Sequence, residues 1–379
     1  ALDMAQGRGG DQAAEMTLDG FTFYGGVSHG VEKRSKVRSR LVADQLVKLI
    51  KEADHVVIMG HRMSDLDAIG AAEGVLRICK ICDVPAVIAV RRDATLAASL
   101  IDALCKAGQK DDFIDPKDAL PIISKRTLCI VVDTYQAGLV ESKDILEKCG
   151  KVAVIDHHRK GVGYIENPAL VCHEPYSSSA SELVTELLQY VGERDDKPNR
   201  VEAEGLLAGI LLDTQDFTLH TGVRTFEAAA ALRRYGAETE RVRRLFDVTM
   251  VEYNAKADLV EKAQMYKNCA ISIGGEVAPE ARVAIAQAAN DLLRIQGVDA
   301  SFVAVQVGNG VNVSARSMGA VNVQVIMESL GGGGHQTMAA AQLKHITPQA
   351  ARSRIQDAID QYYLSQKKTT PEARPAKGE

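Results

Sequence analysis

The sequence predicts an α/β protein in which a parallel-sheet domain is followed by a smaller α/β domain. Three observations favour this fold class. The chain has 379 residues, which is too long for one typical core. Between residues 54 and 236, apolar runs of strand length alternate with helical patterns, as in a parallel sheet with helices on both faces. After residue 268 a second series of strand patterns begins.

The N-terminal segment, residues 1–34, holds two strand-like pieces with glycine-rich turns, Ala13–Leu18 and Phe21–Tyr24, too few to fold alone. A basic run then enters a helix that continues to about Lys51, and the first domain is expected over residues 35–236. A helical connector, a smaller α/β domain and a disordered tail rich in Lys, Thr and Pro are expected over residues 237–268, 269–364 and 365–379.

In the first domain, strands are expected where short apolar runs are rich in β-branched residues. These runs are His55–Met59, Ala86–Val90, Leu128–Val132 and Lys151–Ile155. Helices are expected over Leu66–Lys80, Ile145–Lys148 and Val201–Leu212. Ser177–Ser181 precedes an amphipathic helix that ends near Tyr190, and we interpret these serines as a helix cap rather than as phosphate ligands.

In the second domain, strands are expected at Cys269–Ile273, Val283–Ala286, Phe302–Val307 and Val311–Arg316. Gly308–Gly310 between the last two is a hairpin signal. A helix over Val321–Leu330 ends in four glycines and His335, and a final strand and helix run to about Tyr363.

Composition limits the possible functions. The net charge of −5 gives no basic field for a long nucleic acid. Seven scattered cysteines, including Cys79 and Cys82 within a helical pattern, indicate reduced thiols of a cytosolic compartment. There is no signal peptide and no apolar stretch of about 18 residues. Because the chain starts at Ala1 in a glycine-rich segment, we expect a fragment of a longer protein.

Acidic and imidazole side chains stand where four apolar segments end. In chain order they are His61, Asp65, Asp67, Asp133, Asp156, His157, His158 and Asp213. The carboxyl ends of parallel strands meet at one edge, where α/β proteins build their sites. Close carboxylates raise each other's pKa unless a cation neutralises them. The alternative for each group alone is a helix cap or a polar strand-end turn, but the whole set is oxygen-rich and lacks thiolates, which suits Mn²⁺ or Mg²⁺.

In this order the motifs resemble those of the DHH phosphoesterase superfamily: H-x-x-x-D-x-D ending at Asp67, V-V-D at Asp133, D-H-H ending at His158 and L-L-D-T around Asp213. The strand ending near Arg316 and the run Gly331–His335 resemble its DHHA1 partner domain, and the resemblance covers about residues 50–362. Arg8–Ala13 resembles the end of a degenerate GGDEF domain. This domain order is similar to that of the GdpP-type cyclic di-AMP phosphodiesterases, which are membrane-anchored and carry a sensory PAS domain.

The resemblance implies two Mn²⁺ ions, with Mg²⁺ or another divalent ion as an alternative. One would be held by His61, Asp65 and Asp133, and the other by Asp67, Asp133, His157 and Asp213. A water between them would be the nucleophile, His158 would lie beside the scissile phosphate or leaving group, and Asp156 would orient an imidazole. Arg316, Gly332, Gly333, Gly334 and His335 would bind substrate; the alternative for the glycines is a helix C-cap and turn.

The function implied is hydrolysis of cyclic di-AMP to linear 5′-pApA in a cleft between the two domains. A homodimer at the cytoplasmic face of the membrane, anchored only through an absent N-terminal region, is also implied. Alternatives are a nanoRNase acting on short oligonucleotides, a 3′-phosphoadenosine 5′-phosphate phosphatase, and a non-catalytic cyclic dinucleotide sensor, which would lack a metal ligand. Net acidity and 4% aromatic residues disfavour a long-strand exonuclease. A dinucleotide-dependent oxidoreductase would need G-x-G-x-x-G where Gly60–Asp65 stands.

Overall fold

The computed structural model describes residues 12–17, 20–25, 36–158, 163–193, 196–276, 283–334 and 336–369, with the backbone alone for 12–17, 20–25, 283 and 366–369. Contacts divide the chain after Asp247 into two compact units. Strands β1 (Gln12–Thr17) and β2 (Gly20–Gly25) form an antiparallel hairpin. The signature at Arg8–Asp11 and the tail from residue 370 lie outside the described residues.

The first unit is built on a six-stranded sheet in the order β5-β4-β3-β6-β7-β8, and every ladder in it is parallel. The strands are β3 (Val56–Met59), β4 (Ala86–Ala89), β5 (Phe113–Ile114), β6 (Leu128–Val132), β7 (Lys151–Asp156) and β8 (Leu170–His173). The predicted parallel sheet and its four main strands are therefore confirmed, while the short edge strands β5 and β8 were not predicted.

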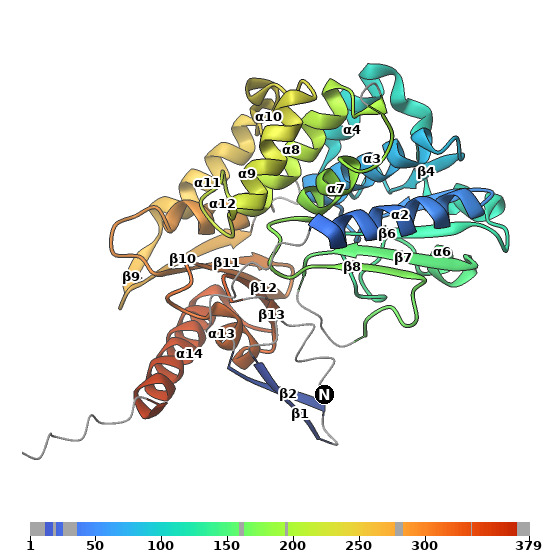
Figure 1. Ribbon diagram of the computed structural model, residues 1–379. Helices are drawn as coiled ribbons and strands as arrows, with labels where there is room; N and C mark the ends of the chain where they lie inside the picture. The colour runs from blue at the N-terminus through green and yellow to red at the C-terminus, as the bar shows by residue number, and fades with distance from the viewer. Residues whose placement is uncertain are drawn as a thin grey trace, which may run out of the picture. The chain divides into compact units, whose positions relative to one another are not determined.

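Helices cover both faces of this sheet (Figure 1). One face carries the larger core, formed with α2 (Lys36–Glu52), α3 (Leu66–Ile81), α4 (Ala98–Leu104), α7 (Ala180–Leu188), α8 (Arg200–Thr214), α9 (Val223–Arg234) and α10 (Thr239–Arg244). The other face packs against α5 (Pro116–Ala119) and α6 (Lys143–Lys148). Short π and 3₁₀ turns, η1 (Cys105–Gln109), η2 (Lys110–Asp112) and η3 (Leu120–Ile122), join these elements.

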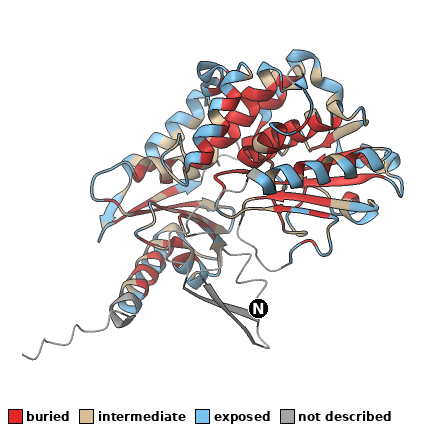
Figure 2. Ribbon diagram, viewed as in Figure 1, coloured by how far each residue is buried: buried red, intermediate tan, exposed pale blue. Residues whose placement is uncertain are grey.

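Burial is densest in the central strands and in α3 and α8 (Figure 2). Strands β3 and β6 are buried along their whole length, as expected for a parallel sheet covered on both sides. Helices α3 and α8 approach closely because glycines face each other, and a Cβ on Gly70 would lie 2.5 Å from the carbonyl oxygen of Gly205. This close helix pair carries two of the predicted site carboxylates, Asp67 and Asp213.

The second unit is a mixed sheet in the order β13-β14-β12-β11-β10-β9, in which only β10 and β11 run parallel among the described strands. Its strands are β9 (Gln264–Tyr266), β10 (Cys269–Glu276), β11 (Ala300–Val307), β12 (Gly310–Ser317), β13 (Gly333–Gly334) and β14 (Met338–Lys344). Its helices are α11 (Met250–Glu261), α12 (Val283–Leu292), α13 (Val323–Ser329) and α14 (Pro348–Thr369). The predicted hairpin is confirmed, with Val307 paired to Gly310.

The strand predicted at Val283–Ala286 is wrong, because these residues begin helix α12. The run is apolar and partly β-branched, but it continues into an alanine-rich segment. Ile285, Ala288 and Leu292 are buried at helical spacing and pack on the sheet. Helix α14 also extends to Thr369, beyond the predicted end near Tyr363. Among the described residues, no helix has the length and apolar character needed to cross a membrane.

Candidate metal centre

The structure brings the predicted ligands of the first unit together at the carboxyl ends of β3, β6 and β7 and the end of α8. Three sets have ligand atoms that all lie within 4.8 Å of one another. They are His61, Asp65 and Asp133; Asp67, Asp133, His157 and Asp213; and Asp133, His157 and His158. The first two sets have the same membership as the two predicted metal sites, and Asp133 belongs to all three.

His61 is oriented by its own loop. Its Nδ1 lies 2.9 Å from the carbonyl oxygen of Arg62, which can only accept, so Nδ1 carries the proton. The other ring nitrogen, Nε2, lies 3.4 Å from Asp133 Oδ2 and 3.8 Å from Asp65 Oδ1. A neutral imidazole of this tautomer presents a lone pair on Nε2 toward the two carboxylates, which is the form that binds metal.

Asp65 and Asp67 differ in what holds them. Asp65 is the N-cap of α3, and its Oδ1 accepts from the backbone N–H groups of Asp67 and Ala68 at 3.0 and 3.1 Å. The alternative interpretation of Asp65 as a helix cap is therefore correct. The same residue also belongs to the candidate ligand set of His61, Asp65 and Asp133. Asp67 is fully buried and is held by the N-terminus of a different helix, α7.

The N-terminus of α7 holds the Asp67 carboxylate. Ala180 N donates to Asp67 Oδ2 at 2.7 Å, and Ser181 N donates to Asp67 Oδ1 at 2.9 Å. These are two of the N–H groups that a helix leaves unpaired at its start, and they favour a negative charge. Ser179 caps the same helix through the backbone N–H of Glu182. The predicted capping function of this serine run is confirmed for Ser179.

Asp133 and His157 lie at the centre of the cluster. Asp133 follows β6 with φ of 59°, a left-handed conformation that aspartate tolerates better than most residues. Its Oδ1 is 3.4 Å from His157 Nε2, and His157 Nε2 is 3.0 Å from Asp213 Oδ2. Neither Asp133 Oδ1 nor His157 Nε2 makes a hydrogen bond of acceptable geometry, although both atoms are buried. Buried polar atoms without such bonds, grouped with carboxylates, fit direct ligation of a cation.

His158 is paired with Asp156, which is completely buried. The Nδ1 atom of His158 lies 2.8 Å from Asp156 Oδ1, and the same oxygen accepts from the His158 backbone N–H at 3.2 Å. Asp156 therefore fixes the orientation of the His158 ring. His173, at the end of the neighbouring strand β8, lies with Nε2 2.5 Å from the carbonyl oxygen of His158 and supports the same turn.

The electrostatics of the cluster also favour a cation. Burial, followed by the charges of Asp133 and Asp213, raises the pKa of Asp67 well above its usual range. Burial lowers the pKa of His61, but the negative carboxylates of Asp133 and Asp65 beside its ring outweigh burial and raise the pKa to about 12. The ionised forms of these buried carboxylates are therefore favoured only when positive charge lies close to them. A divalent cation would supply that charge and leave the imidazoles neutral as ligands.

In the second unit, Arg316 lies on β12 and its Nη1 donates to Ser314 Oγ at 3.1 Å and to the carbonyl oxygen of Ala315 at 2.9 Å. Its Nε is buried without a hydrogen-bond partner, and burial lowers its pKa to about 10. A buried guanidinium with an unsatisfied N–H has capacity for an anionic ligand. His335, the other predicted side-chain donor here, lies outside the described residues.

The glycine run at the end of α13 has mostly structural causes. Gly331 has φ of 79° after the helix, and Cβ atoms on Gly332 and Gly334 would lie 2.2 Å from the Ala340 carbonyl oxygen and 2.4 Å from the Ala339 Cα atom. Gly333 alone in this run has open space and an ordinary φ. Within Gly331–Gly334, packing and backbone conformation therefore explain every glycine except Gly333.

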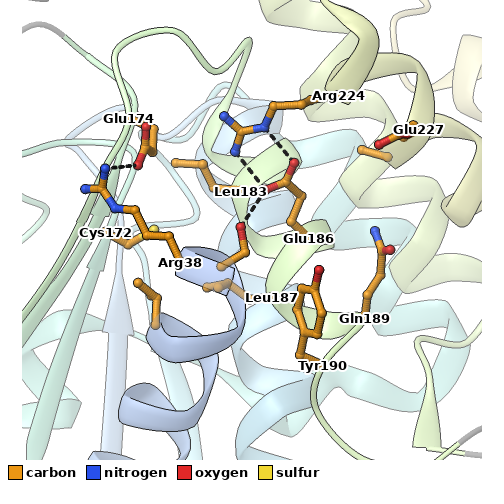
Figure 3. A pocket seen from close by; sticks show the side chains of 13 residues that line it. Arg38, Cys172, Glu174, Leu183, Glu186, Leu187, Gln189, Tyr190, Arg224 and Glu227 are labelled. Carbon is orange, nitrogen blue, oxygen red and sulfur yellow. Dashed lines mark hydrogen bonds and ion pairs between the residues drawn. The ribbon is translucent and has the colours of Figure 1, made fainter. Parts of the chain in front are cut away.

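A pocket elsewhere in the first unit lies between α2, β8, α7 and α9 (Figure 3). Arg224 donates to both oxygens of Glu186 at 2.8 and 2.7 Å, and Arg38 pairs with Glu174 at 2.9 Å. No predicted metal ligand lines it. Since its charged groups pair with one another, the pocket gives no independent sign of a ligand.

Sequence reasoning missed three groups that shape the candidate metal centre. They are the backbone N–H groups of Ala180 and Ser181, which hold Asp67, and Gly209, whose missing side chain makes room for Asp67. The four-residue spacing of Gly205 and Gly209, in the largely apolar second half of α8, is a signal of close helix packing that could have identified Gly209.

Family models match the chain twice: the DHH family, N-terminal domain, over residues 55–210, and the DHHA1 domain over residues 278–364. The chain therefore contains a DHH-family N-terminal domain, and a DHHA1 domain follows it.

More specific similarity follows from individual relatives. The chain is 46% identical over 369 residues to the cyclic-di-AMP phosphodiesterase GdpP of Geobacillus thermodenitrificans, covering 96% of this chain and 56% of that protein. It is 40% identical over 371 residues to the cyclic-di-AMP phosphodiesterase PdeA of Listeria monocytogenes, with the same shares covered. The chain thus spans about half the length of these relatives. An exopolyphosphatase-related protein from Bacteroides fragilis shares the fold, with a TM-score of 0.74 at 20% identity over 86% of this chain and 98% of that one.

Proposed function

We propose that the chain is the catalytic part of a divalent-metal-dependent phosphodiesterase that hydrolyses cyclic di-AMP to linear 5′-pApA. The observation that carries the proposal is the pair of ligand sets that share Asp133 in the first unit. The names of the relatives supply the substrate, because the GdpP and PdeA proteins are cyclic-di-AMP phosphodiesterases. The DHH and DHHA1 domains, together with a cluster able to hold a divalent metal, support a phosphoesterase without reference to a particular substrate or product.

The proposed centre holds two Mn²⁺ ions. Asp65, Asp67, Asp133 and Asp213 carry four negative charges when ionised, which two divalent cations balance. Oxygen ligands with two imidazoles and no thiolate suit Mn²⁺ and also admit Mg²⁺. Ions bound there would supply positive charge that lowers the pKa of a nearby water and neutralises charge developing on the phosphoryl oxygens.

The protein's own groups prepare this chemistry. His61 presents Nε2 because Nδ1 is engaged by a backbone carbonyl. His158, held by Asp156, is the group proposed to donate a proton or hydrogen bond to the leaving oxygen. In the second unit we propose that Arg316, the backbone at Gly333 and His335 contact the substrate, since Arg316 has an unsatisfied N–H and Gly333 has an unobstructed Cα. For Gly332 and Gly334, packing against β14 is a sufficient cause.

We further propose that the chain acts as a homodimer and belongs to a longer protein anchored in the membrane, with this part at the cytoplasmic face. The length of the relatives supports the longer parent, because the chain covers 56% of GdpP.

The test is timed hydrolysis of cyclic di-AMP with Mn²⁺, with chromatographic separation of the cyclic substrate, pApA and AMP. Asp133→Asn is the matched variant, because Asn tolerates the left-handed backbone that Asp133 adopts. We expect pApA to accumulate with the wild type and not with the variant. Faster cleavage of short linear oligonucleotides would contradict the proposed substrate, and tight binding without turnover in Mn²⁺ or Mg²⁺ would indicate a sensor.

A further inference from the structure

Gly209 of α8 lies directly against Asp67. A Cβ atom at position 209 would lie 2.5 Å from Asp67 Oδ1, 2.8 Å from Asp67 Cα and 2.3 Å from Ser181 Oγ. These distances are far below van der Waals contact, so one of the three groups would have to move. Two of these three atoms belong to Asp67, a residue of the candidate metal centre, and one of them is a carboxylate oxygen.

Asp67 cannot move away from position 209 without losing contacts. Its Oδ1 and Oδ2 accept from Ser181 N and Ala180 N at 2.9 and 2.7 Å, and its carbonyl oxygen accepts from Ser181 Oγ at 3.3 Å. Ser181 is in turn fixed, because its own carbonyl oxygen accepts from Thr185 Oγ1 at 2.7 Å. Asp67 is thus held from one side by α7, and only a glycine at 209 leaves room on the other.

We infer that Gly209 is a positioning residue that sets the affinity of the metal centre through Asp67. The inference rests on the proposed divalent-metal site. Oδ2 of Asp67 faces the centre, 4.0 Å from His157 Nε2, while Oδ1 faces Ser181 and position 209. A methyl group at 209 pushes on Oδ1 and rotates the carboxylate, so Oδ2 leaves the position that it shares with Asp133, His157 and Asp213.

Gly74 provides a matched control on the same group of helices. A Cβ atom there would lie 2.5 Å from Val184 Cγ1 and 3.0 Å from Leu206 Cδ2. The overlap resembles that at position 209, but it involves apolar side chains and no predicted ligand. Gly74→Ala therefore reports the cost of widening these helix contacts, without a direct push on Asp67.

The experiment compares wild type, Gly209→Ala and Gly74→Ala by calorimetric titration with Mn²⁺ and by thermal unfolding without metal. We expect both variants to unfold at lower temperature. Only Gly209→Ala should lose Mn²⁺ affinity, by about 10-fold or more, the size of effect seen when a group that orients a ligand is disturbed.

A double variant, Ser181→Ala with Gly209→Ala, separates folding from positioning. It removes the 2.3 Å contact with Ser181 Oγ, so it should recover part of the stability, but it keeps the contact with Asp67 Oδ1 and should stay weak in Mn²⁺ binding relative to Ser181→Ala alone. Wild-type affinity in Gly209→Ala or in the double variant, or an equal loss in Gly74→Ala, would overturn the inference. So would a wild-type protein that binds no Mn²⁺. If the wild type binds Mn²⁺ without hydrolysing cyclic di-AMP and Gly209→Ala still weakens binding, the inference stands and the proposed function fails.

Discussion

Glu73 is a buried residue in the middle of α3, and its surroundings favour the protonated form of its carboxyl group. Gln109 Nε2 donates to Glu73 Oε1 at 2.5 Å and to Glu202 Oε1 at 2.9 Å. Glu73 Oε2 and Gln109 Oε1 are both buried acceptors without a donor. One proton on Glu73 Oε2 could be donated to Gln109 Oε1 and would close a two-bond ring between a carboxylic acid and an amide, satisfying both atoms. Burial, followed by repulsion from Glu202, raises the pKa of Glu73 to about 8.

This raised pKa makes stability depend on pH. The pKa rises from 4.5 in the unfolded chain to about 8 in the folded protein, so the folded state binds a proton that the unfolded state releases. The stabilisation is fully present below the unfolded pKa. It falls by about 1.4 kcal/mol per pH unit between the two pKa values, and the loss is nearly complete above 8, so that it amounts to on the order of 4 kcal/mol between about pH 5 and pH 9. Glu202, Asp112, Lys80 and Arg77 are the charged groups nearby and set the size of this loss.

Glu73→Gln should remove the loss. A glutamine side chain is neutral at every pH, and its amide can reproduce both bonds of the ring with Gln109. We therefore expect the variant to be more stable than the wild type by several kcal/mol at about pH 9 and nearly equal to it at about pH 5. Denaturant unfolding of the whole chain at several pH values measures the difference. Glu240→Gln, at an exposed carboxylate, should leave the pH profile unchanged. Parallel profiles for the wild type and Glu73→Gln would refute the protonated ring.

Three further predictions concern the proposed activity. Asp133→Asn should lower the rate of cyclic di-AMP hydrolysis by about 1000-fold or more with an unchanged circular dichroism spectrum, because it removes the carboxylate shared by the ligand sets; residual activity near wild type would contradict its ligand function. Gly332→Ala should destabilise the second unit by at least about 2 kcal/mol in denaturant unfolding, since its Cβ would meet the Ala340 backbone. Gly333→Ala should unfold like the wild type and raise the KM for cyclic di-AMP. Equal stability losses in the two variants would show that open space at Gly333 is not the deciding feature. Arg316→Lys should raise KM about 10-fold with little change in kcat, because an ammonium cannot reproduce the planar donor pair of a guanidinium; an unchanged KM would remove Arg316 from substrate binding.

The convergence of the candidate metal ligands could be predicted from the sequence because each signal is local. Asp133 and His157 follow apolar strands directly, and His61 follows one after a single glycine. Parallel strands bring their carboxyl ends to one edge of the sheet, whatever the conformation of the loops. The order of the strands need not be known for the side chains to converge. The parallel sheet could be predicted in a similar way, because alternating strand and helix patterns are compatible with only a few sheet topologies.

The parts that were missed depend on contacts between distant segments. Gly209 and Ser181 lie far along the chain from Asp67, and only the packing of α7 and α8 on α3 gives them a function. The helix α12 was mistaken for a strand because a four-residue apolar run has no period of its own, and the sheet on which it packs decides its structure. The pairing of Glu73 with Gln109 likewise depends on where the turn η1 meets α3.

Helices α3 and α8 pair in an antiparallel register that joins these observations. Asp67 meets Gly209, Gly70 meets Gly205, and Arg77 donates to Glu202 at 2.8 Å, so the acidic groups lie at both ends of the contact and the glycines between them. At one end, divalent cations would balance the carboxylates of the proposed centre. At the other end, Arg77 and the proton on Glu73 do so.

A substitution at the Glu73 end of the α3–α8 contact should therefore leave Mn²⁺ binding at the Asp67 end unchanged. Glu73→Gln preserves the ring and leaves the glycine contacts intact, so it should raise stability at high pH without changing Mn²⁺ affinity in a calorimetric titration. If Mn²⁺ affinity changes as well, the helix pair transmits the state of Glu73 to Asp67, and the close glycine contact would couple the two ends instead of insulating them.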